Sequence, residues 1–286
     1  MNEEEREFPP QQQERPGATA EMTPEPHDEM RGYEGSGKLA GRAALVTGGD
    51  SGIGRAVAIA FAKEGADVSI AYLSEDDDAR HTASLVEAAG RRAHTLAADL
   101  TREENCRRAV AETVQALGKL DVLVNNIAYQ APTDDFMEIS SEQWERTFAT
   151  NVHSFFWTTK AALEHLPDGA AIVNTSSING LRGHKSLIDY SATKGAINAF
   201  TYALAQALAP RRIRVNAVAP GPVWTPLIPS TFSEDKVEQF GANTPMGRAA
   251  QPDEIAPSYV FFASAELSSY YSGEVLAPIG GETLPG

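Results

Sequence analysis

The stretch Thr47-Gly48-Gly49-Asp50-Ser51-Gly52-Ile53-Gly54 decides the fold of this 286-residue chain. Residues 42–47 form a short apolar run that predicts a buried strand, and residues 53–63 carry apolar side chains at helical spacing until Gly65. Glycines between a strand and a helix let the backbone approach a pyrophosphate, and free N–H groups at the helix N-terminus bind its negative charge. The stretch therefore predicts a dinucleotide-binding loop, with a generic glycine-rich turn as the alternative.

Strand and helix patterns alternate from this loop to the end of the chain. Six further strands are predicted, at residues 67–73, 92–98, 120–125, 170–176, 213–218 and 274–279. Helices are predicted between them: two opened by capping boxes at 74–77 and 101–104, one from 140–143 to about 166, one over 190–209, and one from Pro252. Apolar strands that alternate with helices indicate an α/β fold. We expect a single Rossmann-type doubly wound domain, with a mostly parallel seven-stranded sheet and helices on both faces.

The first 36 residues differ in composition from the rest of the chain. They are rich in proline, glutamate and glutamine, and their few apolar side chains include Phe8, Met22 and Met30. Such a segment buries too little apolar surface to offset its chain entropy alone. It is either a disordered tail or an arm that becomes ordered on a neighbouring subunit. The predicted organisation is an N-terminal arm, residues 1–36, and a dinucleotide-binding catalytic domain, residues 37–286.

Two features of the second half point to proton-transfer chemistry. Tyr190 and Lys194 are four residues apart in a predicted helix, so their side chains share a face. A nearby ammonium lowers the pKa of a tyrosine towards neutrality, which would make Tyr190 a proton donor and acceptor. Ser176 and Ser177 end the fifth strand, where a hydroxyl could bind a substrate carbonyl oxygen. The alternatives are a helix-surface pair and strand-end turn serines.

Composition excludes several other classes of function. The formal net charge of -15 argues against nucleic acid as the main partner. Cys106 is the single cysteine, so no internal disulfide is possible and we expect a structural role for it. The histidines show no metal-ligand spacing, and no metal site is expected. Because the sequence shows no signal-peptide pattern and no membrane-spanning apolar run, the expected location is the cytoplasm, with no membrane partner.

Taken together, these motifs resemble the short-chain dehydrogenase/reductase family from about residue 38 to the end. The glycine loop resembles the family's Thr-Gly-x-x-x-Gly-x-Gly, and Tyr190 with Lys194 resembles its Tyr-x-x-x-Lys. Ser177, thirteen residues before Tyr190, matches the family's catalytic serine, and Asn151 matches the asparagine that holds a proton-relay water. The resemblance implies NAD or NADP as cofactor and hydride transfer to or from a small carbonyl or alcohol substrate.

The resemblance also implies a set of dinucleotide contacts at one edge of the sheet. Asp99 matches the residue that contacts adenine, and Pro220-Gly221 with Thr225 matches the segment that binds the nicotinamide carboxamide. The implied cofactor-binding residues are Thr47, Gly48, Asp50, Ser51, Gly52, Ile53, Gly54, Tyr72, Asp99, Leu100, Asn126, Ala128, Tyr190, Lys194, Pro220, Gly221, Val223 and Thr225. Two positions depart from the family pattern. Ala128 replaces a glycine where the ribose passes, and Ile279 replaces an aspartate before the final glycines.

A closer similarity is to the general-stress-protein and aldehyde-reductase branch, also labelled glucose/ribitol-dehydrogenase-like. It rests on the arm with Met22-Thr-Pro and on the ending Gly280-Gly281-Glu282. The branch implies an ordered arm, a homotetramer and NADP. The end of the second strand, Tyr72-Leu73-Ser74, has neither the acid that favours NAD nor a cation for a 2′-phosphate, unless Arg55 supplies one. We therefore expect both dinucleotides to bind.

Other functions and the substrate pocket stay open at this point. A non-catalytic dinucleotide-binding sensor or scaffold is the main alternative. The epimerase/dehydratase branch usually has differently spaced glycines, and an enoyl reductase usually has a longer gap between tyrosine and lysine. The expected pocket wall consists of Tyr129, Gln130, Ile178, Leu181 and His184. The segment 224–240 is expected to form a mobile lid, with an ordinary surface loop as the alternative.

Overall fold

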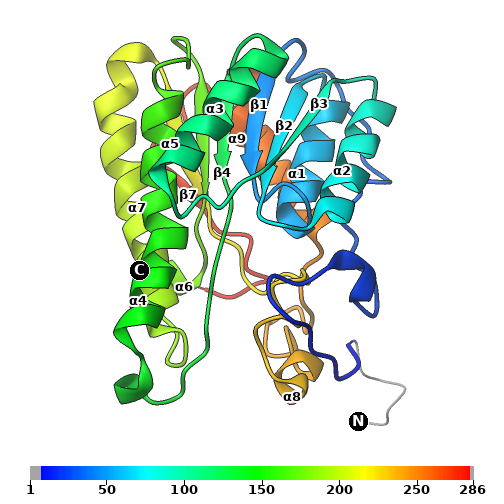
Figure 1. Ribbon diagram of the computed structural model, residues 1–286, viewed down its shortest axis with the longest axis vertical. Helices are drawn as coiled ribbons and strands as arrows, with labels where there is room; N and C mark the ends of the chain where they lie inside the picture. Colours follow the sequence, from blue (N-terminus) through cyan, green and yellow to red (C-terminus); the bar gives the residue numbers. More distant parts are fainter. Residues whose placement is uncertain (1–7, 284–286) are drawn as a thin grey trace.

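Seven parallel strands form one sheet in the computed structural model, which describes residues 8–283. The strands are β1 (Ala43–Thr47), β2 (Asp67–Tyr72), β3 (Ala93–Ala97), β4 (Val122–Asn125), β5 (Ala171–Thr175), β6 (Arg214–Val218) and β7 (Val275–Leu276). Their order is β3-β2-β1-β4-β5-β6-β7. The strand order reverses between β1 and β4, which is where a doubly wound sheet opens a ligand crevice. The predicted fold class is confirmed (Figure 1).

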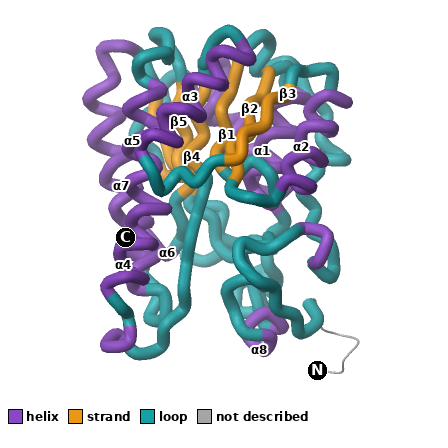
Figure 2. The backbone as a smooth tube through the Cα atoms, viewed as in Figure 1, coloured by secondary structure: helices purple, strands orange, loops and turns teal. Residues whose placement is uncertain are grey.

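Helices cover both faces of this sheet (Figures 1 and 2). One face carries α1 (Gly52–Lys63), α2 (Asp76–Ala88) and α9 (Pro252–Ala263), and the other carries α3 (Glu103–Leu117), α5 (Ser154–Ala162) and α7 (Ile188–Leu208). Shorter helices are α4 (Ser141–Phe148), α6 (Asn179–Arg182), α8 (Glu234–Glu238) and α10 (Ala265–Ser268). Within residues 8–283, no helix is both long and apolar enough to cross a membrane.

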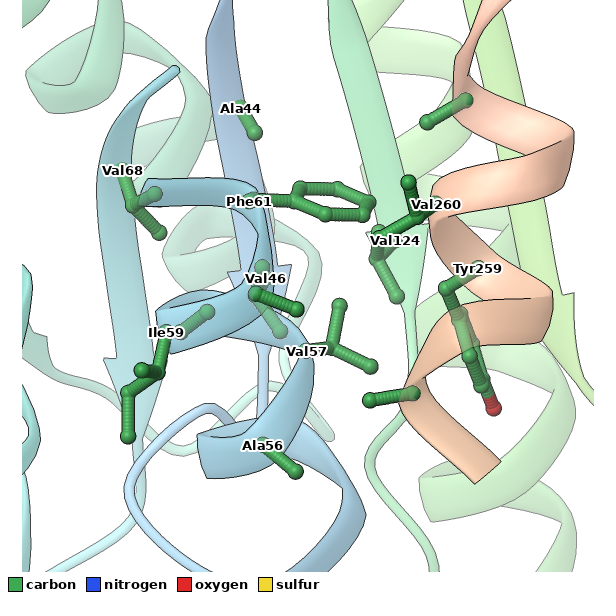
Figure 3. Close-up of a cluster of buried hydrophobic side chains, with 14 of the residues drawn as sticks. Ala44, Val46, Ala56, Val57, Ile59, Phe61, Val68, Val124, Tyr259 and Val260 are labelled. Carbon is green, nitrogen blue, oxygen red and sulfur yellow. The ribbon is translucent and has the colours of Figure 1, made fainter. Parts of the chain in front are cut away.

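The core between α1, α9 and the sheet fixes the position of the glycine loop. Figure 3 shows Val57 and Phe61 of α1, Val124 of β4, and Tyr259 and Val260 of α9 gathered in one cluster. All five side chains are buried. Because interiors of this kind are close-packed, α1 has little freedom to shift along the strands. The first turn of α1 is therefore held at the carboxyl end of β1.

Two predicted helix starts are wrong by one or two residues. The Ser74 hydroxyl donates to the Glu75 carboxylate at 2.6 Å instead of capping α2, which begins at Asp76. The Thr101 hydroxyl likewise donates to Asp99, at 2.6 Å, and α3 begins at Glu103. Both hydroxyls have a carboxylate within two residues, and a charged acceptor competes well with the helix N–H groups for them.

The helix predicted from 140–143 to about 166 is interrupted. Its start is confirmed, because the Ser140 hydroxyl accepts a hydrogen bond from the Gln143 N–H at 3.1 Å. A π-helical turn, η4 (Ala149–His153), then separates α4 from α5. Such turns are rare and often lie at functional sites. At the far edge of the sheet, the strand predicted over 274–279 is only the two residues of β7.

Residues 8–36 pack on their own chain. The Phe8 ring stacks on Trp224 with 3.9 Å between ring centroids, and the Trp224 Nε1–H donates to the Pro24 carbonyl at 2.9 Å. Met30 is buried in the same core as α1 and α9. Figure 1 shows this segment, in blue, beside the segment that carries α8. These contacts within the chain differ from what a disordered tail would make. Packing of the arm on a neighbouring subunit and the boundary between arm and domain at residue 36 stay predictions.

Candidate active site

A cleft of about 1310 Å³ opens at the carboxyl ends of the strands. The predicted site residues that line it are Gly48, Asp50, Ser51, Gly52, Ile53, Tyr72, Asp99, Leu100, Asn126, Ala128, Ser177, Tyr190, Lys194, Pro220, Gly221, Val223 and Thr225. Three predicted site residues, Thr47, Gly54 and Asn151, do not line it. The expected pocket wall is present in Tyr129, Gln130, Ile178 and His184, whereas Leu181 does not line the cleft.

The glycine loop brings the N-terminus of α1 to this cleft. Gly48 and Gly52 have φ angles of +63° and +51°, in the left-handed region that favours glycine. A Cβ atom at Gly54 would lie 1.7 Å from the Gly48 carbonyl oxygen, so only glycine lets α1 pack this closely against the loop. The first N–H groups of a helix have no partner inside it. Ile53 and Gly54 therefore present donors beside the loop.

The end of β4 is tied to the same loop. The Thr47 hydroxyl accepts from the Asn126 N–H at 2.8 Å, and the Asn126 side chain donates to the Gly48 carbonyl at 3.0 Å. Thr47 thus stabilises the wall of the cleft through Asn126 without lining the cleft itself. Ala128, the departure from the family pattern, does not have a positive φ, so its methyl group causes no backbone strain.

Ser177, Tyr190 and Lys194 meet below the end of β5. Lys194 is fully buried; its Nζ donates to the Thr175 carbonyl at 2.8 Å and lies 5.3 Å from the centre of the Tyr190 ring. Burial lowers the pKa of Lys194 to about 7. Burial also raises the pKa of Tyr190 to about 12, against a smaller lowering by its hydrogen bond with Ser177. The lowering of the Tyr190 pKa that was expected from the lysine is therefore not seen in this structure: burial raises the pKa, and the opposing contribution comes from Ser177 and not from Lys194.

The side chain of Asn151 binds the main chain of Tyr129, in the loop that follows β4. Its Oδ1 accepts from the Tyr129 N–H at 2.7 Å, and its Nδ2 donates to the Tyr129 carbonyl at 2.9 Å and to the Thr193 hydroxyl at 3.0 Å. Asn151 lies in η4 and is completely buried. Since both amide protons are used, a water at this residue would have to bind one of its oxygens.

Comparison with known proteins places this arrangement in a family. A family model described as "Enoyl-(Acyl carrier protein) reductase" matches residues 48–283. General stress protein 39 of Bacillus subtilis (strain 168) is 54% identical, over 96% of this chain and 96% of that protein. The crystal structure of a short-chain dehydrogenase from Burkholderia cenocepacia J2315, in complex with NADP, aligns with a TM-score of 0.80 and 32% identity, over 85% of this chain and 98% of that chain.

This chain belongs to the short-chain dehydrogenase/reductase family. Its relatives include "NADPH-dependent aldehyde reductase 1, chloroplastic" of Arabidopsis thaliana, 48% identical over 94% of this chain and 96% of that protein. "Glucose and ribitol dehydrogenase" of Daucus carota is 49% identical over 98% of both chains. The predicted family and branch are confirmed, and so are an oxidoreductase activity and a nicotinamide dinucleotide, NAD or NADP, as cofactor.

In this short-chain dehydrogenase/reductase, Arg55 is not available to a 2′-phosphate. Its guanidinium is 2% exposed and pairs with Asp78 at 2.5 Å and with Asp28 of the arm at 3.3 Å. The two roles considered from sequence, a phosphate contact and a helix-surface residue, are both wrong.

Burial raises the pKa of the neighbouring Asp50 carboxyl to about 6. The Tyr72 hydroxyl at the end of β2 donates to Asp76 at 2.7 Å.

Sequence reasoning missed the arm's part in the dehydrogenase/reductase cleft. Arg15 and Pro16 line the cleft, and so does Arg146 of α4, which contacts the same Tyr129 ring as Arg15 does. Asp28 accepts from the Gly52 N–H at 3.1 Å at the start of α1. No local pattern marks these residues, because the contacts join positions far apart in the chain.

Proposed function

We propose that this enzyme transfers hydride between NAD(P)(H) and the C=O or CH–OH group of an aldehyde, ketone or polyol. The observation that carries the proposal is a fully buried lysine, Lys194, beside Tyr190 and Ser177 in the cleft that contains the glycine loop. Relatives named as an aldehyde reductase and a glucose and ribitol dehydrogenase support this substrate class.

The residues present fit a nicotinamide dinucleotide. Glycines at 48, 52 and 54 leave space where side chains would fill the loop, and the N-terminus of α1 offers N–H donors for a pyrophosphate. Lys194 has three donors and, among the described residues, uses one of them on Thr175. The other two suit ribose hydroxyls. Once bound, the dinucleotide supplies or accepts the hydride.

We assign the remaining steps to four side chains. Ser177 orients the substrate carbonyl by hydrogen bonding, and Tyr190 protonates its oxygen during reduction. A pKa of about 12 keeps the Tyr190 phenol protonated at neutral pH, so the proton for the carbonyl oxygen is present on this side chain. Lys194 holds the ribose and, at 5.3 Å from the centre of the Tyr190 ring, stabilises the phenolate that forms when Tyr190 gives up its proton. Asn151 holds the relay water through an oxygen and fixes the loop at Tyr129.

A substrate panel tests the proposed function. Purified enzyme is incubated with NADPH or NADH and a series of aldehydes, ketones, sugars and an enoyl thioester, and nicotinamide absorbance is followed. We expect aldehydes or ketones to be reduced and the enoyl thioester to remain unchanged. Turnover of the enoyl thioester alone would replace this proposal with enoyl reduction. Dinucleotide binding without any turnover would favour the sensor or scaffold alternative.

Cofactor preference is a separate prediction. The ribose end of the cleft has Asp50 and Glu75 but no free cation from Arg55, which disfavours a 2′-phosphate, whereas NADP is bound by a structural relative. We expect both dinucleotides to bind, with less than about a hundredfold discrimination, or roughly 2.7 kcal/mol. Calorimetric titration of each at equal ionic strength measures this; a larger difference would contradict it.

We also propose a cytoplasmic enzyme without disulfides. The Cys106 thiol is buried, donates to the Leu100 carbonyl at 3.2 Å, and has its pKa raised to about 11 by burial. A thiol of this kind is unreactive at neutral pH. Its role is therefore structural.

A further inference from the structure

Two arginines converge on one tyrosine at the cleft. The Arg15 guanidinium carbon lies 4.9 Å from the centre of the Tyr129 ring, and that of Arg146 lies 4.6 Å from it. Arg15 also donates to the Tyr129 hydroxyl at 3.0 Å. All three residues line the cleft that contains Tyr190. Two like charges are thus held around one ring in a chain whose formal net charge is -15.

These two arginines have no carboxylate partner within residues 8–283. Of the other cations that line the cleft, Lys236 has Asp134 at 3.6 Å and Arg182 has Glu282, whereas Lys185 and Lys194 have no carboxylate partner within residues 8–283. Guanidinium groups present a planar fork that matches a carboxylate or a phosphate. Placing two of them together without an acid leaves a site suited to an external anion.

The chain holds this cluster in place from both sides. The turn that carries Arg15 is closed by Gln13, whose Oε1 accepts from the Ala18 N–H at 2.8 Å and whose N–H donates to the Pro229 carbonyl at 2.9 Å. Tyr129 is fixed by its two main-chain hydrogen bonds with Asn151. Asn151 in turn donates to Thr193, the neighbour of Lys194. The tyrosine that both arginines contact is therefore connected through Asn151 to the helix that carries the catalytic pair.

We infer that Arg15, Arg146 and Tyr129 form an anion subsite, and that the preferred substrates are carbonyl compounds bearing a carboxylate or phosphate group. The inference rests on the proposed carbonyl reduction and assigns its substrate class. It also gives the N-terminal arm a role in substrate recognition, because Arg15 belongs to the arm. Hydride transfer itself is unchanged: the anion is bound away from the carbonyl and takes no part in the bond changes.

Three matched aldehydes test the subsite. 4-Formylbenzoate carries a carboxylate, 4-formylphenyl phosphate carries a phosphate, and methyl 4-formylbenzoate is the neutral counterpart. We expect kcat/KM at low salt to be at least about tenfold higher for one or both anions than for the ester. The difference should shrink as ionic strength rises, because salt screens exposed charges. The ratio between the two anions shows which group the subsite prefers.

The variants Arg15→Gln and Arg146→Gln should each lower kcat/KM for the preferred anion about tenfold, mainly through KM, and change the neutral ester less than twofold. Arg146→Lys should recover part of the loss. Arg107→Gln, at an exposed arginine of α3 paired with Glu103, is the matched control and should leave every substrate unchanged. Equal losses on anionic and neutral aldehydes, or a loss of NADPH affinity in place of substrate affinity, would overturn the inference.

A ligand that cannot be reduced separates this inference from the proposed function. Terephthalate binding to enzyme saturated with NADP is measured by calorimetry in the parent and in the Arg15→Gln/Arg146→Gln double variant. Binding that the double variant loses supports the subsite, even if no aldehyde is reduced and the proposed function fails. Reduction of all three aldehydes with no preference for charge would overturn the subsite and leave the proposed function standing.

Discussion

Tyr190 is the residue on which the proposed chemistry depends. Phenylalanine keeps its shape and removes only the hydroxyl that carries the proton. We expect Tyr190→Phe to lower turnover by about 10² to 10⁴ while changing dinucleotide affinity no more than a few-fold. Tyr202→Phe, at a partly exposed tyrosine of the same helix, is the control. Turnover within tenfold of the parent in Tyr190→Phe would remove Tyr190 from the mechanism.

Asp28 makes a pH-dependent contribution to stability. Burial raises its pKa to about 6 from 3.8, although Arg55 acts in the opposite direction. A raised pKa means that the stability contribution is complete below pH 3.8 and is lost as the pH rises through about 6. The loss of stability at pH 8 is at most about 3 kcal/mol, because each pKa unit between the unfolded and folded values of Asp28 corresponds to about 1.36 kcal/mol.

Asparagine stays neutral at every pH, so it does not cause this loss. We therefore expect the free energy of unfolding of Asp28→Asn to increase relative to that of the parent as the pH rises from 5 to 8. The free energy of unfolding from urea titrations at several pH values measures this difference. Asp77→Asn, at an exposed carboxylate of α2, should follow the parent. Parallel pH profiles for Asp28→Asn and the parent would show that the Asp28 carboxyl does not titrate differently in the folded state.

At the scale of elements, the contact between α1 and the glycine loop forms the dinucleotide site. Alanine usually favours a helix over glycine by about 1 kcal/mol. At Gly54, however, the added Cβ would lie 1.7 Å from the Gly48 carbonyl oxygen and 2.8 Å from the Asn126 side chain. We expect Gly54→Ala to displace the start of α1 and to weaken dinucleotide binding at least about tenfold, or 1.4 kcal/mol.

Gly195→Ala is the matched control for this substitution. Gly195 also lies inside a helix, α7, but the nearest atom to its added Cβ is the Gly180 carbonyl oxygen at 3.8 Å, an ordinary contact. Calorimetric affinities for NADPH should be unchanged in Gly195→Ala. If Gly54→Ala bound NADPH as tightly as Gly195→Ala does, the close packing of α1 on the loop would be unnecessary for binding.

At the scale of the whole molecule, α7 presents an alanine stripe to the outside. The stripe comprises Ala192, Ala196, Ala199, Ala203 and Ala207, and four of the five are exposed while Ala196 is half-buried. It therefore does not face its own sheet, which was the alternative from sequence. Small residues permit close approach of two helices. We propose that α7 packs against another copy in a homotetramer.

Light scattering at micromolar concentration tests this assembly. The parent should have the mass of four chains, and Ala199→Glu should have the mass of two or one, because a buried glutamate would be unpaired at the contact. Ala111→Glu, at an exposed alanine of α3, should remain tetrameric. A monomeric parent, or a tetrameric Ala199→Glu, would exclude α7 as the interface.

Local sequence pattern alone was enough to predict the strands, the glycine loop and the pairing of Tyr190 with Lys194 on one helix face. Apolar period, glycine position and helical spacing are properties of a few neighbouring residues, so they are readable without a fold. The strand-end position pointed to Ser176 and Ser177, and the family resemblance selected Ser177 and added Asn151. The structure brings Ser177 into the same cleft as the loop. The helix starts near Ser74 and Thr101 were misplaced because nearby carboxylates competed for the capping hydroxyls.

Only the tertiary structure decided how distant segments meet. It placed Asp28 of the arm on Arg55, and it brought Arg15 to Tyr129 across more than a hundred residues of chain. It also reversed the expected direction of the Tyr190 pKa shift, because burial is a property of the whole fold. The sequence shows which side chains are neighbours along the chain. Charge pairing and desolvation depend instead on which side chains become neighbours in space when the sheet and helices pack.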